Sequence, residues 1–178
     1  MAFLPDYAEL HALSNFSFLR GASHPEELVS RAHALGYKAL ALTDECSLAG
    51  SVRAHFAAQE CGLKLIHGTE LTVEGAGLVL LATDRQSYGA ISSLITTGRR
   101  RSKKGSYALV RSDLELVEKA NALVLWAPGE NNGGCPGKTV STATPHPPPP
   151  AAVIHGGARP ALLASRRLSM ILPPAGKE

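Results

Sequence analysis

The chain has 178 residues, of which 44% are hydrophobic and 19% charged, and its formal net charge is +3. These proportions are ordinary for a globular domain, and so small a net charge does not by itself indicate a nucleic-acid partner. The three cysteines lack metal-type spacing, and neither a signal peptide nor a membrane span is recognisable. We therefore expect a cytoplasmic protein that does not associate with a membrane.

The first 130 residues alternate short apolar runs with segments of helical periodicity, which is the pattern of an α/β fold. In chain order we expect a strand at 7–10, a helix between Ser23 and Gly36, a strand at 38–43, a helix at 47–61, strands at 63–66 and 78–82, helices at 88–97 and 113–121, and a strand at 122–126. Short connections between these elements favour an α/β layer or barrel with a largely parallel sheet.

The helix that follows the first strand has the clearest end signals. Ser23 is expected to be its N-cap, with Pro25 in the first turn and Glu26 completing a capping box. Gly36 is expected to end the helix as its C′ residue.

The composition changes after residue 130. Nine of the twelve prolines lie between Asn131 and Glu178, four of them consecutive at 147–150, and Glu178 is the only acid in this stretch. Such a composition does not support a packed core. We expect a domain at 1–130 and a disordered or non-native tail at 131–178, which would leave one edge of the strand at 122–126 unpaired.

Four residues of metal-ligand type follow predicted strands. His11 follows the first strand, Asp44 and Glu45 the second, and Glu70 the third. Because the carboxyl ends of parallel strands share one face of a barrel, these side chains should converge, and a mixed histidine and carboxylate set suits Zn, Mn or Fe. In the alternative interpretation, Asp44 and Glu45 cap the next helix, Glu70 is a solvated strand end and His11 is a satisfied polar residue.

A series of motifs in chain order carries a family resemblance. ELHALSNFSFLRGAS (9–23), LTDECSLAG (42–50) and GTEL (68–71) are followed by LLATDR (80–85) and LITTGRRR (94–101). These motifs resemble the PHP (polymerase and histidinol phosphatase) domain, in the form found at the N-terminus of bacterial error-prone DNA polymerases. The resemblance runs from about residue 7 to residue 129.

The resemblance implies part of a distorted, TIM-like β/α barrel whose active members hold two or three metals for phosphoester hydrolysis. His11 would match the first ligand, Asp44 the aspartate of an Asp-His pair, and Glu70 the glutamate. Leu13 stands where a second histidine is expected, and Glu45 replaces the histidine of the pair. An aliphatic side chain cannot ligate a metal, and a carboxylate changes the charge and preference of the site.

We therefore expect His11, Asp44, Glu45 and Glu70 to be a vestigial metal site and the domain to be structural. No cofactor is expected in this fragment; an intact PHP site would take Mn or Zn, and a complete polymerase would use Mg.

A basic run follows the predicted helix at 88–97. Arg99, Arg100, Arg101, Lys103 and Lys104 could neutralise DNA phosphates. Alternatively, they form a solvated loop whose charges complement the helix dipole.

The resemblance implies an N-terminal segment of an error-prone DNA polymerase, active in replication and translesion repair with DNA and other replisome subunits, from which the polymerase active site is missing. Two alternatives stay open. One is a metal-dependent PHP phosphoesterase or exonuclease, and the other is a non-catalytic DNA- or replisome-binding module.

Overall fold

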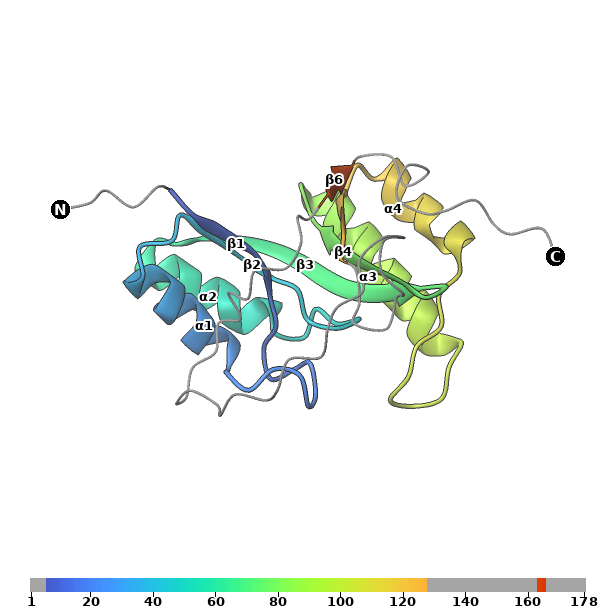
Figure 1. Cartoon of the computed structure of the whole chain (residues 1–178), viewed down its shortest axis with the longest axis horizontal. Helices are drawn as coiled ribbons and strands as arrows, with labels where there is room; N and C mark the ends of the chain where they lie inside the picture. The colour runs from blue at the N-terminus through green and yellow to red at the C-terminus, as the bar shows by residue number, and fades with distance from the viewer. Residues whose placement is uncertain (1–5, 128–162, 166–178) are drawn as a thin grey trace, which may run out of the picture.

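The computed structural model describes residues 6–127 and 163–165, and Figure 1 shows their arrangement. Within these residues one sheet has the strand order β1-β2-β3-β4-β5-β6. The elements are β1 (Ala8–Ala12), α1 (Pro25–Ala34), β2 (Ala39–Leu42), α2 (Ser51–Cys61), β3 (Lys64–Val73), β4 (Ala76–Leu81), α3 (Arg85–Arg100), the 3₁₀ helix η1 (Arg111–Leu114), α4 (Glu115–Lys119), β5 (Leu123–Trp126) and β6 (Leu163–Ser165). The mixed α/β architecture with a curled, half-barrel sheet confirms the predicted fold class.

The sheet changes from parallel to antiparallel pairing along β3. The first half of β3 pairs in parallel with β2, whereas its second half pairs antiparallel with β4, and β4 pairs antiparallel with β5. Glu74 and Gly75, both at positive φ, form the tight turn that joins β3 to β4. The expected largely parallel sheet is therefore wrong beyond the first half of β3, because β3 is ten residues long and the chain turns back directly after it to form β4.

A glycine allows this change of partner. A Cβ on Gly68 would lie 2.5 Å from the carbonyl oxygen of Leu80, so only glycine permits the two strands to approach this closely. His67 pairs with Leu42 of β2, and Gly68 pairs with Leu81 of β4. The junction between the parallel and antiparallel parts of the sheet therefore lies between residues 67 and 68.

The helices lie in two groups along the sheet, with α1 and α2 beside β1–β3 and α3 and α4 beside β4 and β5 (Figure 1). The first group buries Leu28, Val29, Leu40, Leu42 and several alanines. The second buries a cluster of larger aliphatic side chains that includes Leu71, Leu78, Leu80, Ile91 and Leu94. A third cluster, formed by strand residues such as Ala41, Val79, Leu81 and Leu125, contains the residues that alternate with these along the strands.

The end signals of α1 are partly as expected. Gly36 follows the helix with a φ of 75°, which is the conformation expected of its C′ residue. His24, not Ser23, is the N-cap, and the carboxylate of Glu27 accepts a hydrogen bond from the backbone N–H of His24 at 2.8 Å. The predicted capping pair of Ser23 and Glu26 is therefore shifted by one residue.

The predicted boundaries of three other elements move as well. β1 continues to Ala12, so His11 lies within a strand and not after it. α2 begins at Ser51, four residues later than expected, because residues 43–50 form a turn around the predicted site. α3 continues through Gly98 to Arg100, and the first two cations of the basic run therefore belong to a helix.

The outer edge of β5 is paired. β6 runs antiparallel to β5, with Leu163 opposite Trp126 and Ser165 opposite Val124. The expected unpaired edge is therefore wrong. The rest of the tail predicted at 131–178 lies outside the described residues. Within the described part of the chain, no helix combines the length and the apolar character needed to cross a membrane.

Candidate functional site

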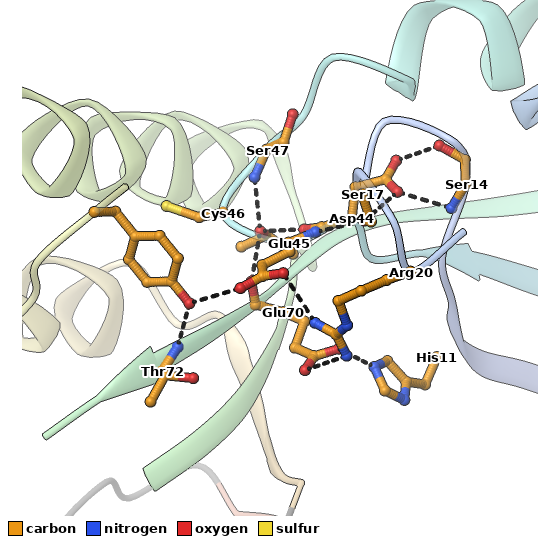
Figure 2. Close-up of polar contacts among 12 residues, drawn as sticks. His11, Ser14, Ser17, Arg20, Asp44, Glu45, Cys46, Ser47, Glu70 and Thr72 are labelled. Atoms are coloured by element: carbon orange, nitrogen blue, oxygen red, sulfur yellow. Dashed lines mark hydrogen bonds and ion pairs between the residues drawn. The ribbon is translucent and has the colours of Figure 1, made fainter. Parts of the chain in front are cut away.

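The predicted ligands lie where β1, the turn after β2 and the middle of β3 come together. His11 extends from β1, Asp44 and Glu45 from the turn, and Glu70 from β3 (Figure 2). Backbone hydrogen bonds hold the turn against β3: Cys46 N–H donates to the Glu70 carbonyl at 2.7 Å, and Glu70 N–H donates to the Thr43 carbonyl at 3.1 Å. His11, Glu45 and Glu70 are brought together as predicted, whereas Asp44 takes part in a separate network.

An arginine binds both glutamates of this group. The Arg20 guanidinium donates to Glu45 Oε2 at 3.1 Å and to Glu70 Oε1 and Oε2 at 3.0 and 3.1 Å (Figure 2). His11 Nε2 lies 2.8 Å from Glu70 Oε2, and the His11 and Glu70 side chains are only 9% and 15% exposed. Both carboxylates are therefore neutralised from within the chain.

The electrostatics of Glu70 follow from these contacts. Burial alone would raise the pKa of its carboxyl, but the hydrogen bond from His11 and the charge of Arg20 outweigh burial and lower that pKa. For Arg20, burial acts to lower the pKa, and the two glutamates reverse the effect and raise it. Glu70 and Arg20 therefore form an ion pair of opposite charges at neutral pH.

The loop between β1 and α1 uses Asp44 as its anchor. Asp44 is 1% exposed, and its Oδ1 accepts hydrogen bonds from Ser14 N–H and the Ser17 hydroxyl, both at 2.7 Å. Its Oδ2 accepts a bond from the Ser14 hydroxyl, also at 2.7 Å. The loop returns so closely that a Cβ on Gly21 would lie 2.0 Å from the Ser14 carbonyl oxygen. The Asp44 carboxylate therefore positions the loop that carries Arg20.

A second arginine, Arg99, also binds the turn. Arg99, near the end of α3, donates to the carbonyl oxygens of Glu45 and Cys46 at 3.2–3.3 Å. Its guanidinium lies 5.4 Å from the ring centre of Tyr107, whose hydroxyl lies 3.4 Å from Glu45 Oε1. The left-handed φ of Cys46, 44°, is held by these contacts.

The basic run therefore divides into two kinds of residue. Arg99 is engaged with the turn, and Arg101 forms a two-pronged ion pair with Asp113, one bond of which measures 2.9 Å. Arg100, Lys103 and Lys104 are exposed and have no ion pair within the described residues. The run begins inside α3, and three of its five cations are available for an outside partner.

The donor set does not fit a metal ion as it is arranged. Both carboxylate oxygens of Asp44 accept hydrogen bonds from the Ser14 amide and from serine hydroxyls. The carboxylates of Glu45 and Glu70 are bound by the Arg20 guanidinium. Leu13 contributes no ligand atom. Among the described residues no group of three or more His, Cys, Asp or Glu side chains is placed to hold a metal.

Sequence reasoning missed Arg20, Ser14, Ser17 and Tyr107. The sequence does contain a signal for Arg20. It is a cation in the loop after the first strand, and several acids are predicted at the ends of the neighbouring strands. The serines and Tyr107 carried no such signal, because their contacts with Asp44 and Glu45 join residues 27–62 positions apart.

The PHP domain family matches residues 9–136, which is most of the chain. The chain therefore belongs to the PHP domain family.

Its curated relatives include error-prone DNA polymerases. The one from Dechloromonas aromatica is 57% identical over 159 residues, which cover 86% of this chain and 16% of that protein. The one from Methylococcus capsulatus is 59% identical over 123 residues, covering 68% of this chain and 12% of that protein. The chain thus spans only 12–16% of the length of these relatives.

Two solved structures are similar to part of this chain. One is from Bifidobacterium adolescentis and was proposed as a metal-dependent phosphoesterase; it is 29% identical, with a TM-score of 0.47, over 55% of this chain and 34% of that one. The other is an amidohydrolase from Chromobacterium violaceum with bound sulfate and no metal; it is 30% identical, with a TM-score of 0.45, over 52% of this chain and 33% of that one.

Proposed function

We propose that this chain is the N-terminal PHP segment of an error-prone DNA polymerase and that its role there is structural. Its parent would take part in replication and translesion repair synthesis in the cytoplasm, with DNA and other replisome subunits as partners. The relatives at 57% and 59% identity support this assignment. The polymerase reaction, with its Mg ions, would belong to a part of the parent outside this segment.

The observation that carries the structural role is the ion pairing of Arg20 with Glu45 and Glu70. A guanidinium at 3.0–3.1 Å from two carboxylates supplies the positive charge that a divalent cation would supply in a hydrolytic PHP site. Unlike a metal, it has no open coordination position for a water molecule or a phosphate oxygen. Arg20 therefore stabilises the site without making it hydrolytic.

Calorimetric titration with Mn²⁺ and Zn²⁺ tests this role. The native chain should bind neither ion with high affinity at this site and should not hydrolyse p-nitrophenyl phosphate or shorten a DNA strand. Arg20→Ala should acquire Mn²⁺ binding, at least tenfold tighter than native, because Glu45 and Glu70 are then left facing each other. Arg31→Ala, an exposed arginine on α1, is the matched control and should behave like the native chain.

Two results would overturn the proposal. One is metal-dependent release of phosphate or nucleotides by the native chain that is lost in His11→Ala, which would favour the phosphoesterase. The other is primer extension by the purified 178-residue chain, which would place the polymerase activity within it.

A second candidate function is non-catalytic DNA binding. Arg100, Lys103 and Lys104 support it because they are exposed and unpaired within the described residues. Three phosphate contacts would give a slope of about −2.7 for log K against log salt concentration with duplex DNA. Replacing all three by alanine should flatten this slope and weaken binding, whereas the double variant Arg31→Ala/Lys119→Ala should not. Equal losses in both variants would contradict this function.

A further inference from the structure

A groove of about 830 Å³ lies between α2 and α3, away from the Arg20 site. Its walls come from α2, the first half of β3, the end of β4 and the first turn of α3, with Leu10 of β1 and Leu123 of β5. None of His11, Arg20, Asp44, Glu45 and Glu70 lines it. Its size is within the range of small-molecule sites, and its lining is mainly apolar with a few polar groups, as is usual for such sites.

Three flat rings meet in this groove. The His55 and His67 ring centres are 6.0 Å apart, and Tyr88 contacts the His67 ring edge-on at 5.7 Å with an interplanar angle of 79°. Phe56 also lines the groove and is 60% exposed. His55 is exposed as well. The exposed rings of His55 and Phe56 are stacking surfaces for another flat aromatic group.

His67, which lines the groove, has one ring nitrogen without a hydrogen-bond partner among the described residues. Nδ1 of His67 is buried, and it neither accepts nor donates a hydrogen bond within the described residues. Burial lowers the pKa of His67, with a smaller contribution from the nearby His55, so the ring is neutral at pH 7. A neutral imidazole is an uncharged flat ring with one donor and one acceptor nitrogen.

Two cations lie at the same groove. Lys64, at the start of β3, and Arg85, the first residue of α3, both line it and are exposed. Neither has an ion pair among the residues placed in the structure. The neighbouring Asp84 also lines the groove, but its carboxylate caps α3 by accepting the Ser87 N–H at 2.7 Å. The groove therefore combines aromatic surface with unpaired positive charge.

We propose that this groove binds a nucleotide unit, with the base against His55, His67 and Tyr88 and the phosphate at Lys64 and Arg85. A purely apolar ligand would leave both cations without partners. Inorganic phosphate alone would leave the aromatic surface unused. A nucleotide uses both the aromatic surface and the two cations, and it can come either from a free nucleotide or from single-stranded DNA.

Calorimetric titration of the full chain with dAMP, deoxyribose 5-phosphate and the oligonucleotide (dA)₆ tests the proposal. We expect saturable binding of dAMP and at least tenfold weaker binding of deoxyribose 5-phosphate. His55→Ala and Arg85→Ala should each weaken dAMP binding at least fivefold. Both residues are exposed, so these variants should retain the native circular dichroism and melting transition, and His33→Ala and Arg31→Ala on α1 are their matched controls.

Tighter binding of (dA)₆ than of dAMP would identify single-stranded DNA as the source, and equal or weaker binding would identify a free nucleotide. The proposal is overturned if dAMP shows no saturable binding, if deoxyribose 5-phosphate binds as tightly as dAMP, or if the α1 control variants lose as much affinity as the groove variants.

Discussion

The two halves of the sheet are stabilised in different ways. Around α1 and α2 the buried residues include four alanines together with Leu28, Leu40 and Leu42. The same half buries polar side chains that are 0–1% exposed, among them Ser14, Ser17 and Asp44. Around α3 and α4 the cluster consists mainly of leucine, isoleucine and valine.

This difference shows which interactions stabilise each half of the sheet. Small apolar residues leave little apolar area to bury, so the first half depends on hydrogen bonds that form only in one geometry. Large aliphatic residues stabilise the second half by area and packing. The first half should therefore be sensitive to the loss of single polar groups, and the second to the loss of volume.

Asp44→Ala should give the largest effect. It leaves the Ser14 amide and the Ser14 and Ser17 hydroxyls without their acceptor in a buried place. Hydrogen bonds to a charged group contribute roughly 1.5–3 kcal/mol each, so we expect a total loss of about 4 kcal/mol after partial relaxation. Urea unfolding followed by circular dichroism measures it. Asp6→Ala, at an exposed aspartate, is the control. Equal effects of the two would refute the dependence of this half on its polar network.

Leu94→Ala should give the next largest effect, in the other half. Leu94 is fully buried on α3 and packs in the aliphatic cluster. Truncation of a buried leucine costs about 3 kcal/mol, because transfer energy is lost and a cavity remains. Leu116→Ala, at a half-exposed leucine on α4, should cost well under about 1 kcal/mol. A loss at Leu94 no larger than at Leu116 would show that packing does not dominate here.

The same division explains what the sequence could predict. Helix α1 and strands β2 and β5 were placed nearly correctly because their apolar spacing is a local property. The second half of β3 was also readable in principle: buried Leu71 and Val73 alternate with Glu70 and Thr72, and Glu74-Gly75 is a turn signal. The prediction ends this strand at residue 66 and places Glu70 after it, so the motif GTEL lies outside the predicted strand.

The candidate site was predictable only in part. Residue type and position after strands identified His11, Glu45 and Glu70 as neighbours. The pairing of Arg20 with two of them depends on a loop conformation that Asp44 sets through long-range hydrogen bonds. No local pattern encodes a side-chain contact 50 positions apart, so the cation at the site required the structure.

The smallest expected effect concerns His67, which lies at the junction of the two halves. Its pKa is lowered below 6.5 by burial and by the nearby His55, so the folded state disfavours the charged ring. The unfolded chain therefore binds a proton more readily, and stability should fall as the pH drops from about 6.5 to the folded pKa of His67. Urea midpoints measured at pH 7.5 and across this acidic window test the effect.

His67→Gln should remove most of this pH dependence, because glutamine does not titrate, whereas His33→Gln at an exposed position on α1 should keep it. Glu70 does not produce this signal. The pKa of Glu70 is lowered from 4.5, so its own loss of stability begins only below that pH. If the pH dependence of stability is unchanged in His67→Gln, protonation of His67 does not cause it. Another titrating group in one of the two halves would then be responsible.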